Sequence, residues 1–361
     1  MSRIAARCGA LALLLLTLAA CSGPQSAQQP APTAGQAAPS TAAPPAAADV
    51  VVAYNTPEQW ANWGGVLRAF SEQTGISAPS DPKNSGQTLA ALEAEAAVPQ
   101  ADTAYYGIVF GITAAEKGLV APYKPAGFDQ IPASLKDAQG RWMAVHQGAI
   151  AFLVNTDELG GAPVPQCWAD LLKPDYAGKV GFLDPAQAAV GYSVITAANL
   201  ALGGSLDNFD PGARFFAQLH AAGLSLPAQT ATALVQQGEI PILIDADFNG
   251  YKLRNVDQAP IEVVLPCEGT IAVPYVMSLV KDAPRPAAGQ ALLDFALSDA
   301  GQRLFAESYL RPIRPVEINP EIAAGMLPAS QYERVSAPDF GQMRAVQTGV
   351  IERWTKEVVK P

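Results

Sequence analysis

The chain has 361 residues, of which 49% are hydrophobic, and this is enough apolar material for two domains with their own cores. Its formal net charge is −10, which argues against a nucleic acid as partner. It has only two histidines, and it lacks a Gly-x-Ser-x-Gly elbow, a His-Glu-x-x-His motif, a phosphate loop and paired cysteines at metal-binding spacing. An enzyme is therefore disfavoured.

Residues 1–20 have the pattern of a signal peptide. Arg3 and Arg7 form a basic start, and the apolar stretch that follows, residues 9–20, is too short to span a bilayer. The stretch ends in Leu-Ala-Ala-Cys21, which resembles the lipobox of bacterial lipoproteins, in which the cysteine becomes the lipidated first residue. An ordinary signal peptide with an incidental cysteine is the alternative.

Residues 21–48 are predicted to form a linker. From Ser22 to Ala48 the chain contains only Ala, Pro, Gln, Ser, Thr and Gly, with no charged residue. Such a segment cannot bury an apolar face, so we expect a disordered tether between the lipid on Cys21 and the folded body.

The folded part begins with a strand-to-helix turn. Val50–Ala53 is rich in β-branched residues, as in a buried parallel strand. Thr56 is expected to cap a helix that has Pro57 in its first position and Gln59 completing a capping box. In open α/β sheets, ligands bind where strands lead into helices. The candidate ligand contacts at this turn are Tyr54, Asn55 and Thr56.

Two further turns of this kind follow in the first half of the chain. Residues 84–88 open a second helix, where Ser85 either caps the helix or gives its hydroxyl to a ligand. A third strand ends at Tyr105 and Tyr106. Successive side chains of a strand point to opposite faces, so the two tyrosines should not both be core, and one is expected to face a cleft.

Similar turns recur in the second half. Asp184–Gln187 repeats the order of cap, proline and glutamine and is expected to start a helix. The strand Ile240–Ile244 leads into Asp245 and Asp247, two carboxylates one residue apart. Asp247 either caps the next helix or faces a bound cation together with Asp245.

The two halves should be linked by strands. Residues 141–156 are expected to form two strands that contain His146, which we interpret as structural. Ile261–Leu265 predicts a strand that leaves the second domain, and Ile271–Val280 predicts one that returns to the first. The chain should close with a helix over Phe340–Val358.

Cys167 and Cys267 are the two cysteines that follow the leader and Cys21. In an exported, oxidising setting we expect them to form a disulfide, with two buried free thiols as the alternative.

The chain from residue 50 to about residue 315 resembles the extracellular solute-binding proteins of bacterial ABC importers, in the branch that includes iron(III), thiamine, polyamine and phosphonate binders. The segments that carry the resemblance, in chain order, are VVVAYNT, NSGQTLAALEAE, PQADTAYYG, EKGLVAPY, FLVNTDEL, CWADLLKPDYAGKVGFLDPA, GEIPILIDADFNGYKLR, PIEVVLPCEGTIAVP and LLDFALSDAGQRLFAE.

The resemblance implies an α/β, two-lobe type II periplasmic-binding (Venus-flytrap) fold, in which each lobe is a sheet flanked by helices and two crossover strands join the lobes. Lobe 1 would comprise residues 49–156 and 269–315, and lobe 2 residues 157–268. Residues 316–361 would form a C-terminal helical segment that packs on the lobes. Ligand contacts are implied at the turns described above, namely at Tyr54, Asn55, Thr56, Ser85, Gly86, Tyr105, Tyr106, Asp184, Tyr192, Asp245, Asp247 and Asn249.

Departures from the family pattern bear on the ligand. Residues 186–191 carry no hydroxyl before Tyr192, which disfavours an anion, and the tyrosine pair lies in the first lobe, unlike that of ferric binders. Tyrosine rings and the Asp245 and Asp247 carboxylates would suit a small organic cation, polyamine-like in character. Iron(III) is the other candidate, and whether the site holds a metal stays open.

We therefore expect a lipid-anchored protein, on the outer face of the cell membrane or in the periplasm, that captures a small polar solute and delivers it to an ABC permease. It should act as a monomer without a cofactor, and contact the membrane through its lipid. A hydrolase or transferase on a two-lobe scaffold and a ligand-presenting sensor subunit are the alternatives.

Overall fold

A computed structural model describes residues 50–227 and 231–360. The chain divides into two units, residues 1–46 and 47–361, and the fold below is that of the second unit. The expected signal peptide, the lipidation site Cys21 and the linker 21–48 lie outside the described residues. None of the helices in the described ranges has the length and apolar character needed to cross a membrane.

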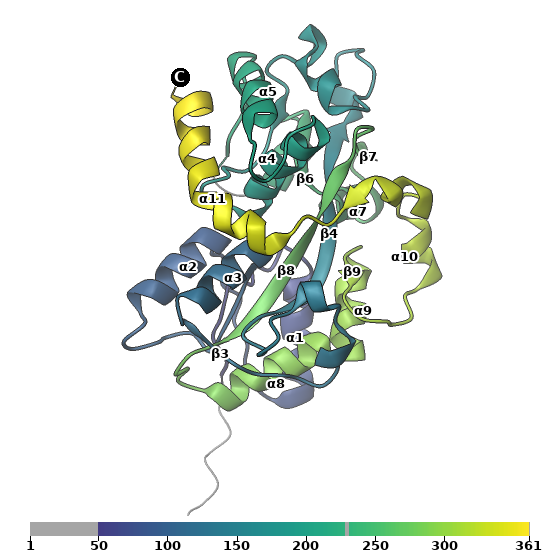
Figure 1. Cartoon of the computed structure of the whole chain (residues 1–361). Helices are drawn as coiled ribbons and strands as arrows, with labels where there is room; N and C mark the ends of the chain where they lie inside the picture. The colour runs from purple at the N-terminus through teal and green to yellow at the C-terminus, as the bar shows by residue number, and fades with distance from the viewer. Residues whose placement is uncertain (1–49, 228–230, 361) are drawn as a thin grey trace, which may run out of the picture. The chain divides into compact units, whose positions relative to one another are not determined.

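Two long antiparallel strands run through the centre of this unit (Figure 1). They are β4 (Met143–Asn155) and β8 (Thr270–Val280), which pair from Met143 and Met277 to Ala149 and Ala272. On its other edge, β8 pairs with β2 (Thr103–Gly107) from Tyr275 to Leu279. Beyond the segment shared with β8, β4 pairs with β6 (Ile242–Ala246) and β7 (Ile261–Val264). Each long strand therefore belongs to both halves of the structure.

The strands of the described residues form one mixed sheet, and the main path through it is β1-β2-β8-β4-β6-β5. The remaining strands are short: β1 (Ala53–Tyr54), β3 (Val120–Ala121), β5 (Val180–Gly181), β9 (Arg311–Pro312) and β10 (Val335–Ser336). The sequence predicted two strands within residues 141–156. That was wrong, because β4 is one strand whose register shifts between Ala144 and His146.

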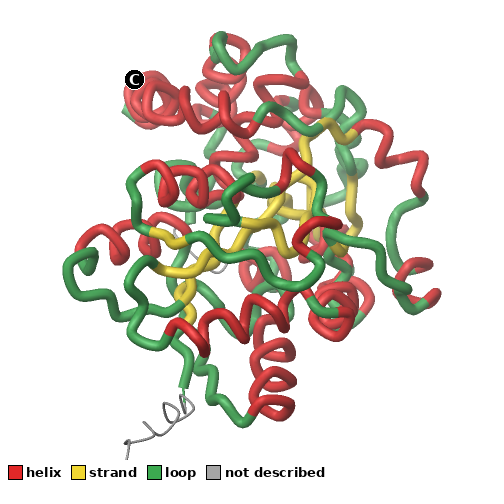
Figure 2. Tube along the Cα trace, turned by 60° about the horizontal axis from the view of Figure 1, so that its bottom comes forward, coloured by secondary structure: helices red, strands yellow, loops and turns green. Residues whose placement is uncertain are grey.

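Helices surround the sheet (Figure 2). The helices on the β2 side, which we call lobe 1, are α1 (Trp63–Thr74), α2 (Ser85–Ala94), α3 (Ile108–Glu116), α8 (Pro286–Leu297) and α9 (Asp299–Glu307). Those on the β6 side, lobe 2, are α4 (Ala189–Ala201), α5 (Asp210–Ala221), α6 (Ala231–Gln236) and α7 (Asp247–Asn255). This is the expected fold of two lobes joined by two crossover strands.

The C-terminal segment contacts both lobes through α11 (Phe340–Trp354), which follows the short helix α10 (Pro320–Ala324). Arg344 of α11 forms an ion pair of 2.9 Å with Glu116 of α3 in lobe 1. The hydroxyl of Tyr192, in α4 of lobe 2, donates to the carbonyl of Met343 at 2.7 Å. The segment therefore bridges the lobes.

Two helices start later than the sequence predicted. α1 begins at Trp63, and its N-cap is Asn62 in a left-handed conformation. The Thr56 hydroxyl does not cap a helix, because it donates to the carbonyl of Ala53. Asp184 likewise closes a turn by accepting from the amide of Ala186, and α4 starts five residues later.

Both tyrosines at the end of β2 are core residues. Tyr105 and Tyr106 are each 0% exposed. The prediction that they could not both be buried was wrong, because helices cover both faces of the sheet at β2 and both sets of alternating side chains meet protein.

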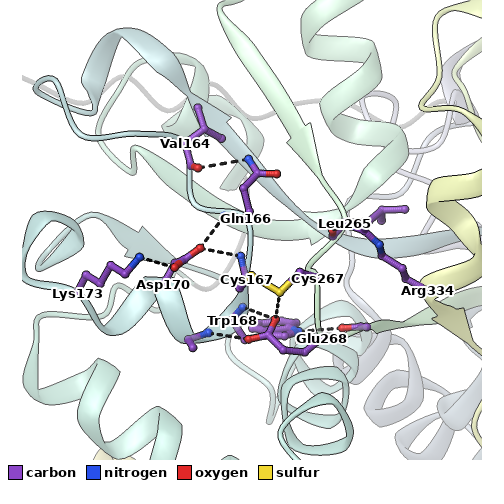
Figure 3. Close-up of a disulfide and its surroundings, with 12 residues drawn as sticks. Val164, Gln166, Cys167, Trp168, Asp170, Lys173, Leu265, Cys267, Glu268 and Arg334 are labelled. Carbon is purple, nitrogen blue, oxygen red and sulfur yellow. Dashed lines mark hydrogen bonds and ion pairs between the residues drawn. A yellow bond between two sulfur atoms is a disulfide. The ribbon is translucent and has the colours of Figure 1, made fainter.

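A disulfide joins Cys167 and Cys267, the two cysteines expected to pair, with an S–S distance of 2.12 Å (Figure 3). The neighbouring Glu268 carboxylate accepts from the amides of Trp168 at 2.8 Å and Ala169 at 3.0 Å. These amides begin the short 3-10 helix Trp168–Leu172. The disulfide thus fastens the entry to lobe 2 to the turn between β7 and β8.

Candidate functional site

A cavity of about 450 Å³ lies between the lobes. Lobe 1 contributes the segment after β1 and the start of α2, and lobe 2 contributes the start of α4 and a residue of α6. β8 contributes Tyr275. The lining residues are Asn55, Pro57, Glu58, Gln59, Trp60, Ser80, Pro82, Lys83, Asn84, Ser85, Leu183, Ala188, Ala189, Val190, Thr232 and Tyr275.

Two helices from opposite lobes begin at this cavity. Asn84 caps α2 by a reciprocal capping box, in which its side chain accepts from the amide of Gln87 at 2.9 Å and its own amide donates to the Gln87 side chain at 3.0 Å. α4 begins after Ala188, which supplies no side-chain cap. The first N–H groups of a helix have no partner within it, and the helix dipole is positive there. At α2 the amide of Gln87 already donates to the Asn84 side chain and the amide of Gly86 to the carbonyl of Gln187, so α2 contributes its dipole, whereas the first turn of α4 has no side-chain cap. The cavity is therefore favourable for negative charge at two ends, and most strongly at the start of α4.

One cation and one anion line the cavity. The ammonium group of Lys83 lies 2.7 Å from the Asp81 carboxylate and 3.9 Å from the centre of the Tyr54 ring. The Glu58 carboxylate lies 3.6 Å from Arg68, and both of these side chains are largely exposed. An exposed pair at this distance is weak, so Glu58 can exchange Arg68 for a ligand.

Aromatic rings form one wall. Trp60 and Tyr275 both line the cavity, with ring centres 5.6 Å apart in an edge-on arrangement. The indole N–H of Trp60 donates to the hydroxyl of Tyr105 at 3.0 Å, behind the wall. The wall is therefore fixed by a residue that does not itself line the cavity.

The lobes touch each other beside the cavity. The amide of Gly86, in the first turn of α2, donates to the carbonyl of Gln187 in lobe 2 at 3.0 Å. Gly107 also approaches lobe 2 closely, since a Cβ built on it would lie 2.3 Å from the Cβ of Ala189. The described conformation is therefore one in which the two lobes are in contact.

Among the candidate ligand contacts, Asn55 and Ser85 line the cavity. Gly86 lies beside it through the contact with Gln187. Ser85 accepts from the amide of Gly107 at 3.2 Å, and Asn55 donates to the carbonyl of Tyr105 at 2.7 Å. Both side chains are thus held in place by β2.

Besides Gly86, four candidates of lobe 1 are not among the lining residues, and neither is Asp184 of lobe 2. Tyr54 donates to the Glu95 carboxylate at 2.9 Å, and Asp184 closes the turn before α4. Thr56 is 0% exposed, as are Tyr105 and Tyr106.

The remaining lobe 2 candidates also have partners within the protein. One Asp247 oxygen accepts from the Arg311 guanidinium at 2.5 Å and from the Tyr332 hydroxyl at 2.8 Å, and the other accepts from the amide of Ala149 at 2.8 Å. Asp245 contacts the side chain of Asn249 at 3.3 Å, and burial raises the pKa of Asp245 to about 7. Neither carboxylate lines the cavity. Tyr192 does not line it either, and its hydroxyl donates to the carbonyl of Met343 in α11.

Several lining residues were not singled out from the sequence. Glu58 and Lys83 each lie within three residues of a turn that was selected, and this nearness is the signal that could have found them. Tyr275 and Thr232 carried no such signal, because Tyr275 lies in a crossover strand and Thr232 in a short helix of lobe 2.

Within the described ranges, one group of metal-ligating side chains comes together, formed by Cys167, Cys267 and Glu268, with ligand atoms within 4.8 Å of one another. Both sulfurs are used in the disulfide, so they cannot serve as thiolate ligands.

Two lobes, two crossover strands and a cavity between the lobes define a type II periplasmic binding protein. The model of the family described as bacterial extracellular solute-binding protein matches residues 101–342, and the chain belongs to this family. Proteins of this kind deliver small ligands to ABC permeases, and the chain is a solute-binding protein of an ABC importer.

Similar proteins include an uncharacterized protein of Haemophilus influenzae, 32% identical over 248 residues that cover 66% of this chain and 70% of the relative. A putative 2-aminoethylphosphonate-binding periplasmic protein of Salmonella typhimurium is 28% identical over 299 residues, covering 80% and 85%. The solved periplasmic binding protein AfuA of Actinobacillus pleuropneumoniae, with fructose-6-phosphate bound, has a TM-score of 0.75 at 25% identity and covers 87% of this chain and 99% of its own.

Proposed function

We propose that the cavity between the lobes captures a small solute that carries a phosphonate or phosphate group, with an aminoalkylphosphonate as the preferred class. The protein releases this solute unchanged to an ABC permease and acts as a monomer. The observation that carries the proposal is that α2 and α4, from opposite lobes, both begin at the cavity.

The anionic end of the solute would lie between these helix starts. Backbone N–H groups at a helix N-terminus bind phosphate-like groups through hydrogen bonds and the helix dipole together, and the uncapped start of α4 can supply both. The Gly86 and Gln87 amides of α2 already have partners, so α2 would contribute its dipole. Lys83 lies on the same side, directly before the cap of α2, where its ammonium group is shared with the Asp81 carboxylate. This arrangement supports an anion even though residues 186–191 offer no hydroxyl.

The amino end of the solute would pair with Glu58, the carboxylate among the lining residues. The apolar wall of Trp60 and Tyr275 would cover the short carbon chain between the two charged ends. The names of two similar proteins agree with this class, because one is a putative 2-aminoethylphosphonate-binding protein and the other was solved with a sugar phosphate.

A small organic cation or iron(III), the ligands suggested by the sequence, has less support from the geometry. Asp245 and Asp247 have partners within the protein and do not line the cavity. Tyr105 and Tyr106 are buried behind it. Either ligand would have to rely on Glu58 for negative charge.

Calorimetric titration tests the proposal with four ligands: 2-aminoethylphosphonate, ethylphosphonate, spermidine and iron(III) citrate. We expect 2-aminoethylphosphonate to bind, and at a hundredfold excess over Kd to raise the free energy of unfolding by about 2.7 kcal/mol. Glu58→Gln should weaken 2-aminoethylphosphonate about tenfold and leave ethylphosphonate, which lacks the amine, unchanged. Binding of spermidine or iron(III) alone would contradict the proposal.

We further propose that Cys21 carries the lipid that keeps the protein at the membrane, with residues 22–48 as the tether. The lipobox-like end of the leader supports this. Mass spectrometry of the N-terminal peptide should find a lipid on Cys21, and Cys21→Ser should release the protein from the membrane fraction. A Cys21→Ser protein that stays with the membrane would count against the anchor.

A further inference from the structure

We propose that Tyr105, which does not line the cavity, is a positioning residue of the solute site, because its hydroxyl holds the Trp60 wall to the crossover strand β4. The inference rests on the proposed function only in taking the cavity as the solute site.

Tyr105 contacts three lining residues at once. Its carbonyl accepts from the Asn55 side chain at 2.7 Å, and its hydroxyl accepts from the Trp60 indole at 3.0 Å. Its ring stacks on Tyr275, with centres 5.1 Å apart and planes inclined by 19°. A single buried residue therefore contacts polar and aromatic parts of the cavity, and its side chain sets the position of the aromatic part.

The same hydroxyl reaches the strand that joins the lobes. It lies 2.8 Å from Nε2 of His146, on β4 at the register shift. An indole can only donate, so the Tyr105 oxygen accepts from Trp60. Its bond with Nε2 forms with either tautomer of His146, because a phenol hydroxyl can donate to a bare nitrogen or accept from an N–H. Burial lowers the pKa of His146 to about 3, which keeps the imidazole neutral. The chain of bonds runs from Trp60 through Tyr105 to His146.

The segment that carries Trp60 needs such support. Asn55, Ala61 and Asn62 all have positive φ, at 63°, 53° and 56°. Residues with a Cβ adopt this conformation rarely, and they keep it where surrounding contacts enforce it. The enforcing contacts here are the two bonds to Tyr105 and the bond from the Asn62 side chain to the carbonyl of Leu304 at 2.6 Å.

Tyr105→Phe tests the inference, because it removes only the oxygen and keeps the ring that stacks on Tyr275. Tyr106→Phe is the matched control, since Tyr106 is the next residue of β2, is equally buried and points to the other face of the strand. The first measurement needs no ligand. It follows the indole N–H resonance of Trp60 by ¹H–¹⁵N NMR, with assignment from Trp60→Phe.

In Tyr105→Phe we expect this resonance to shift and its hydrogen exchange to speed up at least tenfold, whereas Tyr106→Phe should leave both unchanged. An unchanged Trp60 signal in folded Tyr105→Phe would overturn the inference. If Tyr105→Phe does not fold, the test is made on the wild-type protein. There the inference requires the Trp60 indole hydrogen to exchange slowly. Exchange at the rate of free indole would then overturn it.

The second measurement is the Kd for 2-aminoethylphosphonate in a double-mutant cycle. We expect Tyr105→Phe to weaken binding about tenfold, and Tyr105→Phe with Trp60→Phe to bind no more weakly than Trp60→Phe alone. Losses that simply add would contradict positioning through Trp60. If wild-type protein does not bind 2-aminoethylphosphonate, the ligand assignment fails, and the NMR measurement still tests Tyr105.

Discussion

Gly86 and Gln187 join the two lobes at the edge of the cavity, where the Gly86 amide donates to the Gln187 carbonyl at 3.0 Å. A side chain at position 86 has no room, because a Cβ there would lie 2.8 Å from that carbonyl oxygen. The glycine that opens α2 is thus required for the lobes to meet.

Gly86→Ala should therefore impair solute binding without unfolding either lobe. The added methyl group forces the lobes apart where the solute is enclosed, so we expect the Kd for 2-aminoethylphosphonate to rise about tenfold, or about 1.4 kcal/mol. Gly349→Ala is the control, because Gly349 lies within α11 with no heavy atom within 4 Å of the added Cβ. It should raise the free energy of unfolding by about 0.5–1 kcal/mol and leave the Kd unchanged. Wild-type affinity in Gly86→Ala would refute the closure role.

Tyr192 is predicted to contribute to stability and not to ligand recognition. Its hydroxyl donates to the carbonyl of Met343 at 2.7 Å in a buried contact between α4 and α11. Tyr192→Phe leaves that carbonyl without its donor, so the free energy of unfolding should fall by about 1 kcal/mol. Titration should return the wild-type Kd. A weaker Kd with unchanged stability would restore Tyr192 to the ligand site.

The ion pair of Asp247 and Arg311 should contribute more to the free energy of unfolding than the Tyr192 hydrogen bond does. The Asp247 side chain is fully buried and also accepts from Tyr332 and from the amide of Ala149 in β4. Removing one member of a buried ion pair leaves the other charge uncompensated, and Asp247→Asn should lower the free energy of unfolding by about 3 kcal/mol. Urea unfolding measures this, and Asp299→Asn is the control because its carboxylate is 60% exposed in its pair with Arg314. A loss in Asp247→Asn no larger than in the control would contradict the prediction.

The regular elements could be predicted from the sequence, and the irregular turns could not. The second crossover strand, expected over 271–280, and the closing helix, expected over Phe340–Val358 and begun by α11 at Phe340, follow from residue patterning. The start of α1 was not predicted because Ala61 and Asn62 take left-handed conformations that their residue types do not predict. Tertiary contacts to Tyr105 and Leu304 stabilise the conformation of that segment.

The sequence indicated where the candidate site lies better than it indicated which residues line it. Strand-to-helix turns do surround the cavity, and Asn55 and Ser85 line it. Asp245 and Asp247 were selected because two carboxylates one residue apart at a strand end suggested a cation. Arg311 and Tyr332, the partners that occupy Asp247, lie more than sixty residues away in the chain, so no local pattern could reveal them.

The disulfide should stabilise lobe 2 without affecting the ligand. Cys167 and Cys267 are 100 residues apart in sequence, and a cross-link over such a span restricts the unfolded chain strongly. Replacing both cysteines by alanine should lower the free energy of unfolding by about 3 kcal/mol. Dithiothreitol should lower the Tm of the wild-type protein and not of the double variant, and the Kd should stay the same. Equal Tm values of the wild-type protein with and without dithiothreitol, when thiol titration finds two free cysteines, would contradict the prediction.

Asp245 should make stability depend on pH. Burial raises its pKa from 3.8 to about 7 in the folded protein, so between these values the folded state holds a proton that the unfolded state has lost. The stabilisation is fully present below about pH 4 and is lost as the pH rises through 7, by roughly 1 kcal/mol per pH unit.

Asp245→Asn keeps an oxygen that can accept from Ala246 and Asn249 but does not titrate. Its free energy of unfolding, relative to wild type, should therefore rise between pH 4 and pH 7 and level off above. Urea unfolding at pH 4.5, 6 and 8 measures this difference, and Glu262→Gln, at an exposed position of β7, corrects for the lost charge. A difference that is the same at all three pH values would show that Asp245 is ionised in the folded protein, and burial would then not be the dominant influence on its carboxyl group.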